Sequence, residues 1–219
     1  MDMEQARFNM VEQQIRPWDV LDPRVLNLLS EVRREDFVPA EQRMLAFVDM
    51  EVPLGHEAAM LSPKMEARIL QEIQIHDGAR VLEIGTGSGY LTALLARAVG
   101  SGSVTSVDIV PEFTAAAREK LARHGIANAT CETGDAARGW PGMDGYDYIV
   151  VTGSLPMLPE AYTKNLKVGA LLFAVVGECP VMEAQLIQRL TPDNFRFVNL
   201  FETCIPALKN AQIPQHFKF

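Results

Sequence analysis

The sequence predicts an α/β fold, a doubly wound and mostly parallel sheet with helices on both faces. A short apolar run over residues 81–84 leads into three glycines at alternate positions, 85, 87 and 89, and an apolar helical pattern follows them. Apolar runs then alternate with helical patterns as far as residue 176, which is typical of parallel strands joined by crossover helices. The last two extended runs flank a turn, and they predict a C-terminal antiparallel hairpin.

Three helices are predicted before the first strand of the core, over residues 4–16, 23–33 and 64–74. Asp22 and Pro23 form a typical helix start. Apolar residues then recur at helical spacing in the second helix, which predicts one buried face. The segment 40–60 is expected to be loop, because it carries Pro53 and Gly55.

The remaining elements follow in order along the chain. Gly100 and Gly125 each follow a helical pattern, where glycine can adopt the left-handed conformation that ends a helix. The turn before the last extended run is Thr191-Pro192-Asp193-Asn194. Strands are expected over 79–84, 103–107, 129–132, 148–152, 170–176, 181–190 and 195–201, and helices over 91–99, 112–123 and 159–166.

Composition excludes several classes of protein. The 219 residues are 48% hydrophobic and 22% charged, as in an ordinary globular domain. A net charge of −8 argues against a nucleic-acid partner. No apolar run approaches the roughly 20 residues that span a bilayer, and the N-terminus does not resemble a signal peptide. We therefore expect neither a membrane partner nor export from the cytoplasm.

The three cysteines, Cys131, Cys179 and Cys204, are widely spaced and odd in number. This usage predicts reduced thiols, with neither a disulfide framework nor a zinc site. Elsewhere no group of histidines, cysteines and carboxylates has metal-ligand spacing, so no metal is expected.

The glycine loop lies between a strand and a helix, where doubly wound sheets bind ligands. Dinucleotide-binding loops have the spacing G-x-G-x-x-G, whereas this loop has G-x-G-x-G. Glu83 precedes the first glycine by two residues, and it would repel a pyrophosphate but suit a cationic amino-acid group. S-adenosylmethionine (SAM) carries an ammonium and a sulfonium, and no phosphate. The loop is therefore similar to motif I of the SAM-dependent methyltransferases; the alternative is a glycine-rich turn of another α/β protein.

Two aspartates follow predicted strands. Asp108 comes 23 residues after Gly85 (108 − 85), close to the position at which a carboxylate holds a ribose diol in doubly wound folds. Asp135 follows Gly134 and is expected to accept a hydrogen bond from the adenine amine. The alternatives are a solvent-exposed helix cap for Asp108 and an Asx turn for Asp135.

The segment after the fourth core strand bears on the methyl acceptor. It reads Val151–Pro156 and lacks the Asp/Asn-Pro-Pro-Tyr motif of many enzymes that methylate base or amide nitrogens. An oxygen acceptor, above all a carboxylate, fits better. A carboxylate is ionised at neutral pH, so its attack on a sulfonium methyl needs alignment and desolvation but no general base.

Several blocks of the sequence carry a family resemblance: 25–39, 53–55, 83–93, 134–135, 146–152 and 166–177. Through them the chain resembles the protein-L-isoaspartate O-methyltransferases, repair enzymes that esterify the free α-carboxylate of isoaspartyl residues. The match runs from about residue 20 to 180 and more loosely to the end. It implies a Rossmann-like methyltransferase core over 76–219 with a helical, substrate-side segment over 1–75 packed on it. It also implies SAM as the donor, isoaspartyl peptides or proteins as acceptors, and cytoplasmic repair.

The resemblance and the motifs together define two sets of site residues. Glu83 and the 85–89 loop are expected to hold the methionine end of SAM, Asp108 the ribose and Asp135 the adenine. The cofactor set is Glu83, Gly85, Thr86, Gly87, Ser88, Gly89, Asp108, Ile109, Gly134, Asp135, Ala136 and Thr152. The substrate-side set is Ala59, Met60, Leu61, Lys64, Ile205 and Pro206.

The substrate side departs from the family pattern. Family members carry Thr-Ile-Ser-x-Pro, whose serine helps to hold the reacting carboxylate. With Pro63 aligned to that proline, Leu61 replaces the serine and Ser62 falls one residue late. Ser62 is the catalytic candidate if the loop slips locally; the alternative is that it only caps the helix that begins at Pro63. Residues 203–207 also replace an Arg-Phe-Val-Pro-Leu-like stretch.

These departures leave three hypotheses open. The first is isoaspartyl methylation. The second is methylation of a different small acidic or hydroxyl acceptor, and the third is a SAM-binding paralogue that does not catalyse. A nicotinamide oxidoreductase is disfavoured by the glycine spacing and Glu83.

Overall fold

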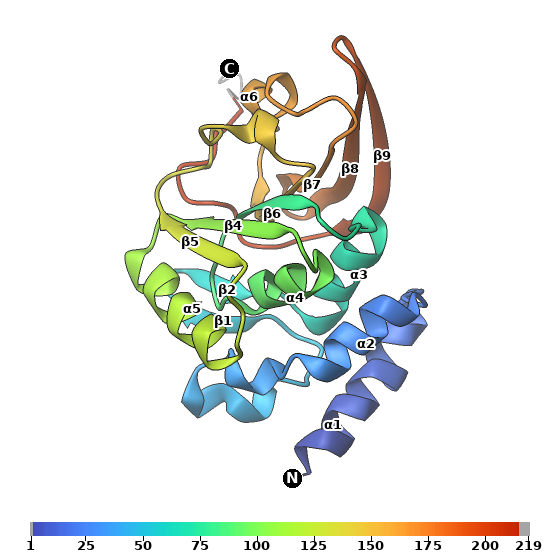
Figure 1. The fold of residues 1–219 in the computed structure, drawn as a ribbon, viewed down its shortest axis with the longest axis vertical. Coiled ribbons are helices and arrows are strands. Elements are labelled where there is room, and N and C mark those ends of the chain that lie inside the picture. The colour runs from blue at the N-terminus through green and yellow to red at the C-terminus, as the bar shows by residue number, and fades with distance from the viewer. Residues whose placement is uncertain (1, 215–219) are drawn as a thin grey trace.

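The computed structural model describes residues 2–214 and contains a seven-stranded sheet in the order β5-β4-β3-β6-β7-β8-β9 (Figure 1). Met1 and the last five residues of the expected 76–219 unit lie outside that range. The first five strands of this order are parallel, and β8 and β9 are antiparallel. This confirms the predicted sheet and its C-terminal hairpin. The strands are β3 (Arg80–Ile84), β4 (Ser103–Asp108), β5 (Ala129–Thr133), β6 (Tyr148–Leu155), β7 (Leu171–Glu178), β8 (Val181–Thr191) and β9 (Asn194–Thr203).

Helices cover both faces of the sheet. Successive strand residues point to opposite faces, and they enter two separate hydrophobic clusters. Val81 and Val150 pack with side chains of α3, α4 and α5, whereas Leu82 and Ile149 pack with Tyr162 of α6. The sheet is therefore doubly wound, as predicted. The helices are α3 (Pro63–Ile73), α4 (Tyr90–Ala98), α5 (Pro111–Arg123) and α6 (Glu160–Lys164).

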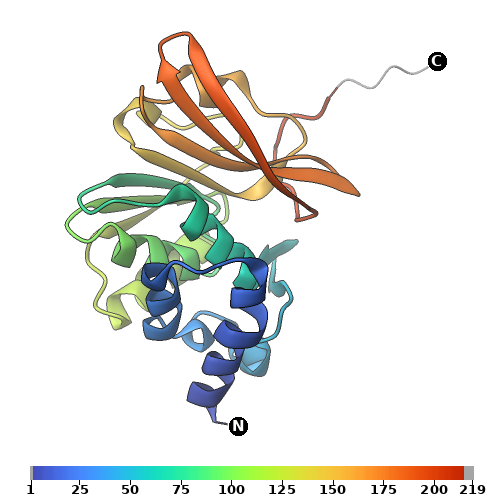
Figure 2. The same ribbon diagram turned by 90° about the vertical axis from the view of Figure 1, so that its right-hand side faces the viewer.

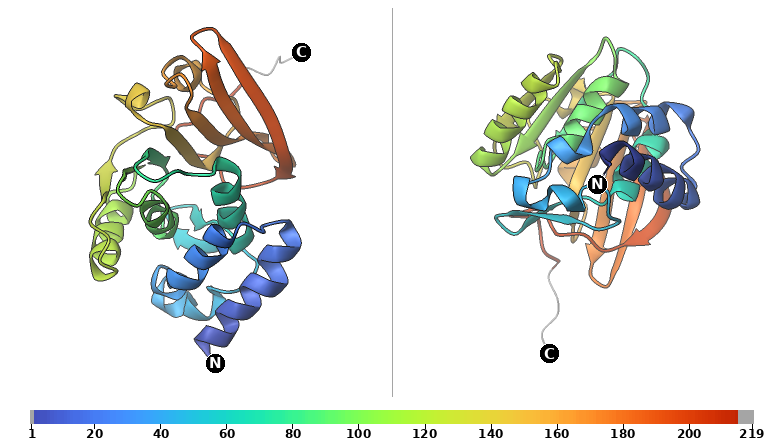
Figure 3. Two further views of the ribbon diagram at one scale, coloured as in Figure 1. Left: turned by 45° about the vertical axis from the view of Figure 1, so that its right-hand side comes forward. Right: turned by 90° about the horizontal axis from the view of Figure 1, so that it is seen from below.

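The N-terminal helices gather at the end of the molecule opposite the long β8–β9 hairpin (Figures 2 and 3). The Asp22 carboxylate accepts a hydrogen bond from the Arg24 amide at 2.9 Å and so caps the second helix as expected. Met10 and Leu29 belong to the same buried cluster as Tyr90 of α4; the division at residue 75 stays a prediction. The elements are α1 (Met3–Met10), the π-helical η1 (Val11–Ile15), the 3-10 turn η2 (Arg16–Trp18), α2 (Pro23–Glu31), η3 (Arg34–Asp36) and η4 (Ala40–Leu45), and a further 3-10 turn, η5 (Met143–Gly145), precedes β6.

A small antiparallel hairpin lies in the segment that we expected to be loop. It consists of β1 (Val52–Gly55) and β2 (Ala58–Met60). The turn residues His56 and Glu57 have φ values of 52° and 60°, a left-handed pair typical of two-residue hairpin turns. Such turns usually carry Asn-Gly or Asp-Gly, so the sequence His56-Glu57 does not predict a hairpin here.

Cys179 and Cys204 form a disulfide with a Cα–Cα distance of 5.7 Å. The expectation of three reduced thiols is therefore wrong for this pair, whereas Cys131 is free and buried. The sheet register explains the pairing. Cys179 follows β7 and Cys204 follows β9, and both strands pair with the start of β8. This long-range register could not be inferred from the spacing of the cysteines.

Within residues 2–214, no helix is both long enough and apolar enough to cross a membrane.

Candidate active site

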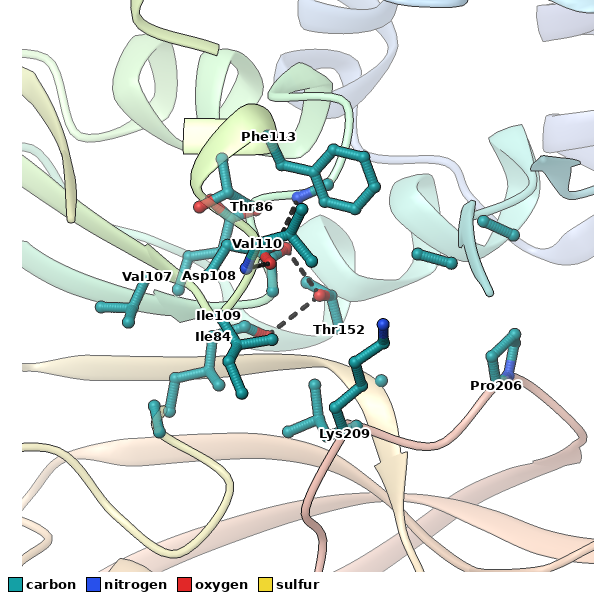
Figure 4. Close-up of a pocket in the computed structure, with 18 of the residues that line it drawn as sticks. Ile84, Thr86, Val107, Asp108, Ile109, Val110, Phe113, Thr152, Pro206 and Lys209 are labelled. Carbon is teal, nitrogen blue, oxygen red and sulfur yellow. Dashed lines mark hydrogen bonds between the residues drawn. The ribbon is translucent and has the colours of Figure 1, made fainter. Parts of the chain in front are cut away.

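A pocket lies at the carboxyl ends of β3, β4 and β6 (Figure 4). The chain runs from β3 to β4 and β5 on one side and returns to β6 on the other, so the pocket sits where the strand order reverses. Doubly wound folds bind their ligands there. Its wall is formed by residues 57–61, 66, 83–88, 91, 107–110, 113, 134–137, 152–153 and 206–209.

The structure brings most of the predicted site residues to this wall. Of the cofactor set, all but Gly89 line the pocket. Of the substrate-side set, Ala59, Met60, Leu61 and Pro206 line it, and Lys64 and Ile205 do not. Sequence reasoning missed other lining residues, including Glu57, Glu66, Phe113, Leu208 and Lys209.

The glycine loop is fixed by close contacts that exclude side chains. Gly85 has a φ of 104°, and a Cβ atom there would lie 2.1 Å from Thr152 Oγ1. That hydroxyl donates to the carbonyl oxygens of Ile84 and Gly85, at 3.0 and 2.8 Å. Gly89 has a φ of 81°, and a Cβ atom there would lie 2.9 Å from the Cβ of Ala117 on α5. Gly89 thus lets α4 begin against α5, which explains its absence from the wall.

Glu83 is fully buried, and one of its two carboxylate oxygens has no hydrogen-bond partner within residues 2–214. Oε2 accepts a hydrogen bond from the Thr92 hydroxyl, whose oxygen lies 3.3 Å from Ser106 Oγ. Oε1 is buried without a hydrogen-bond partner among the described residues. Burial, helped by the nearby charge of Asp108, raises the pKa of Glu83 to about 7, although hydrogen bonds from Ser106 and Thr92 oppose the shift. An unpartnered buried oxygen on the wall of a pocket fits a cationic ligand group.

Asp108 ties the second strand to the glycine loop. Its Oδ2 accepts from the Gly87 amide and its Oδ1 from the Val110 amide, both at 2.9 Å. A carboxylate offers about four acceptor sites, so the half-buried group can still accept from the two hydroxyls of a diol.

Asp135 adopts the Asx turn that was its alternative role and also lines the pocket. Oδ1 accepts from the Ala137 amide at 3.0 Å, and Oδ2 accepts from the Asn210 side chain at 2.8 Å. The C-terminal segment is thereby held across this end of the pocket.

Leu61 lies on the wall at the position where the resemblance places the family serine. Its side chain is buried, and its carbonyl accepts from Arg34 Nη2 at 2.6 Å. Ser62 is not on the wall, and its side chain makes no capping hydrogen bond to α3. No contact of the Ser62 hydroxyl therefore supports either the catalytic interpretation or the capping alternative. Lys64 is also elsewhere, because its ammonium pairs with Asp49 at 2.8 Å.

A buried ion pair, Arg34–Glu66, holds the Leu61 backbone through the hydrogen bond from Arg34. The fully buried Arg34 pairs with Glu66 and donates through Nε to the Ala46 carbonyl at 2.8 Å. Glu66 lines the pocket, and burial raises its pKa to about 8 although the charge of Arg34 opposes the shift. The helical pattern over 64–74 predicts α3, which carries Glu66. The ion-pair partner Arg34 comes from a distant segment, and no local pattern reveals it.

Residues 205–209, which we term the strap, lie on the opposite side of the pocket, and 206–209 line it. Ser154 of β6 holds them, since its amide donates to the Pro206 carbonyl and its carbonyl accepts from the Leu208 amide, both at 2.9 Å. The Ser154 hydroxyl donates to the carbonyl of Ile205, which is itself buried behind the wall.

Comparisons with known proteins decide the family. Residues 5–205 match the family model described as Protein-L-isoaspartate(D-aspartate) O-methyltransferase (PCMT). The chain belongs to the protein-L-isoaspartate(D-aspartate) O-methyltransferase family. This confirms the predicted resemblance and the class of SAM-dependent methyltransferases.

Relatives and solved structures agree with this membership of the PCMT family. Protein-L-isoaspartate O-methyltransferase 1 of Rhodopseudomonas palustris strain HaA2 is 40% identical over 185 residues, 84% of this chain and 74% of the relative. Protein-L-isoaspartate O-methyltransferase of Ignicoccus hospitalis is 34% identical over 88% of this chain and 92% of its own length. A Plasmodium falciparum structure, described as a member of this family in complex with S-adenosyl-L-homocysteine, has the same fold. Its TM-score is 0.79 at 20% identity over 95% of this chain and 99% of that one.

Within the described range, 2–214, no group of three or more histidine, cysteine, aspartate or glutamate side chains could hold a metal ion.

Proposed function

We propose that this protein transfers the methyl group of SAM to the free carboxylate of isoaspartyl residues in damaged proteins, as a cytoplasmic repair enzyme. The observation that supports this function best is the single pocket that joins two unlike walls. One wall consists of the glycine loop and acidic residues suited to SAM, and the other consists of residues 57–61 and the strap. Donor and acceptor can therefore meet in one space.

The residues present fit SAM. The unpartnered Oε1 of Glu83 suits the ammonium of the methionine end, and the close packing of Gly85 against Thr152 holds the glycine loop at the pocket. Asp108 retains acceptor capacity for the ribose diol, and Asp135 stands where the adenine is expected. Three further residues of the wall would contribute backbone and apolar surface to the adenosine half of SAM: Ile109, Gly134 and Ala136.

When bound, SAM supplies an electrophilic methyl group on a sulfonium. The acceptor carboxylate oxygen forms the new carbon–oxygen bond as the carbon–sulfur bond breaks, with its electron pair left on sulfur, and no proton moves. The protein's task is to align the two groups and to exclude water. Met60, Leu61 and Leu208 provide apolar surface for this exclusion.

A cytoplasmic location suits a SAM-dependent repair role. Both cysteines of the Cys179–Cys204 pair are exposed, so cellular thiols can reach the disulfide.

A second candidate function is methylation of a different acidic acceptor. It is favoured by Leu61, which puts an apolar side chain where the family resemblance places a serine.

Transfer from labelled SAM to an isoaspartyl peptide, beside the aspartyl peptide of the same sequence, tests the proposal. Transfer to the isoaspartyl peptide alone is expected. If SAM binds and neither peptide is methylated, the second candidate or a paralogue without catalysis takes its place.

A further inference from the structure

The wall of the pocket carries more acidic than basic side chains, although Arg34 behind it offsets the charge of Glu66. Among the described residues that form it, Lys209 alone carries a positive charge. The carboxylates are those of Glu57, Glu66, Glu83, Asp108 and Asp135. An acceptor of the proposed reaction is itself an anion, so it would be repelled on entry unless a cation faces it.

The backbone on both sides of Lys209 is anchored. The preceding Leu208 amide donates to the Ser154 carbonyl at 2.9 Å. The following Asn210 side chain donates to Asp135 Oδ2 at 2.8 Å. From this fixed position the Lys209 side chain points into the pocket, toward the side on which Thr152 and Phe113 lie (Figure 4).

Lys209 also differs from every other lysine that the structure describes. Lys64, Lys164 and Lys167 each pair with a carboxylate at 2.7 or 2.8 Å. Lys120 donates to two backbone carbonyl oxygens, at 2.7 and 3.1 Å. Within residues 2–214, no carboxylate or carbonyl oxygen holds the Lys209 ammonium. An exposed cation that lines the pocket on an anchored segment, without such a partner among the described residues, is available to a ligand.

We propose that Lys209 binds the carboxylate of the methyl acceptor and thereby selects anionic acceptors. This inference rests on the proposed function. Lys209 thereby takes the place of Lys64 as the cation expected on the substrate side, because the Lys64 ammonium contacts Asp49 and the Trp18 ring.

The chemistry defines the kinetic signature of this role. The negative charge of the acceptor disappears as its oxygen bonds to the methyl carbon and the electron pair of the broken carbon–sulfur bond stays on sulfur. Lys209 remains protonated throughout. Its attraction is therefore strongest before the reaction and fades toward the transition state, so it lowers KM without raising kcat. The neutral ester is no longer held, which favours its release.

The test compares Lys209→Met, Lys209→Arg and the control Lys164→Met in the full-length protein. Lys164 is an exposed side chain of α6 and is absent from the wall, so the control removes the same charge elsewhere. Each variant is assayed for KM and kcat on an isoaspartyl peptide, and for its SAM dissociation constant by calorimetry. An isoasparaginyl peptide, the neutral isostere, serves as a competitive inhibitor.

For Lys209→Met we expect KM to rise about 5- to 20-fold, the range of a charge-assisted contact that is partly solvated. We expect kcat to stay within about twofold or to rise. SAM affinity and inhibition by the isoasparaginyl peptide should not change, and Lys209→Arg and Lys164→Met should behave like the wild type. An unchanged KM in Lys209→Met overturns the inference, as does weaker SAM binding with an unchanged KM, which would assign Lys209 to the cofactor's carboxylate. If the wild type neither binds nor methylates the isoaspartyl peptide, the proposed function fails and this inference falls with it.

Discussion

The two walls of the pocket are built in different ways. The cofactor wall comes from residues that are close in sequence, because one strand, its glycine loop and the next strand end bring Glu83, Gly85 and Asp108 together. The acceptor wall is assembled from two segments that are far apart in the sequence, residues 57–61 and the strap, which meet only through the finished fold. A site that forms locally can be predicted from a motif. A site that forms by long-range packing can change its chemistry while the motif stays the same.

The largest effect is expected from crowding the cofactor wall with Gly85→Ala. The added Cβ would lie 2.1 Å from Thr152 Oγ1, and φ at this position is 104°, so the loop must shift. We expect SAM affinity to fall on the order of 100-fold, measured by calorimetry.

Gly125→Ala is the matched control, because Gly125 also has a positive φ but faces open space. The double variant Gly85→Ala/Thr152→Ala should recover part of the affinity by removing the colliding hydroxyl. Full SAM binding by Gly85→Ala would contradict the close packing of this wall.

The next effect concerns the pKa of Glu83, which burial raises to about 7. Since the ionised carboxylate is the form that attracts an ammonium, SAM affinity should fall about tenfold per pH unit below that value. Glu83→Gln should bind SAM about 10- to 100-fold more weakly at pH 7.5 and show little of this pH dependence. Calorimetric titrations between pH 5.5 and 7.5 measure both quantities, and equal pH profiles for the two proteins would rule out this role of Glu83.

The same group predicts the sign of a stability change in the ligand-free protein. The folded state keeps the Glu83 proton up to a pKa of about 7, whereas the unfolded chain loses it near pH 4.5. This contribution to stability is therefore complete below about pH 4.5 and is lost as the pH rises through 7, by on the order of 3 kcal/mol. Denaturant unfolding of the wild type and Glu83→Gln should reveal it: the two proteins should be similar in stability below about pH 4.5, and the wild type should become the less stable of the two as the pH rises.

On the acceptor wall, Leu61→Ser introduces the hydroxyl that the family pattern places there. We expect kcat/KM on the isoaspartyl peptide to rise about 3- to 10-fold through one added hydrogen bond, while SAM affinity stays constant. Leu61→Ala is the matched control, because it leaves the same cavity without the hydroxyl. Lower activity of Leu61→Ser than of Leu61→Ala would show that this chain positions its acceptor by other contacts.

The contrast between the walls also explains how much could be predicted. The strand–loop–helix order and the alternating apolar runs follow local periodicity, so the sheet and its helices could be located from the sequence, and eleven of the twelve residues predicted to bind the cofactor line the pocket. Gly89 shares the glycine pattern but serves helix packing, a distinction that needs the position of Ala117. Lys209, Glu66 and the Cys179–Cys204 pair depend on contacts between distant segments. No local pattern encodes such contacts, and so sequence reasoning chose Lys64 instead and expected free thiols.

A smaller effect is expected from the disulfide, because Cys204 directly precedes the strap. The double variant Cys179→Ser/Cys204→Ser should lower the free energy of unfolding by about 2 kcal/mol, somewhat less than loop-closure entropy alone implies, since the β8–β9 hairpin already closes the loop. We expect KM for the acceptor to rise only about threefold, because Ser154 still holds the strap. SAM affinity should remain that of the wild type, and a larger loss for SAM than for the acceptor would show that the two walls are not independent.

The smallest effect is expected from Ser62→Ala. Ser62 occupies the N-cap position of α3, yet its hydroxyl makes no capping hydrogen bond and does not reach the wall of the pocket. We therefore expect stability to change by no more than about 0.5 kcal/mol and kcat to change less than about twofold, compared with about tenfold or more for a group that holds the reacting carboxylate. Combining Ser62→Ala with Leu61→Ser sharpens the result, because the added hydroxyl should keep its full benefit when Ser62 is absent. A tenfold loss of kcat in Ser62→Ala at unchanged SAM affinity would instead assign the acceptor contact to Ser62, and would mean that the segment 59–63 shifts by one residue when an acceptor binds.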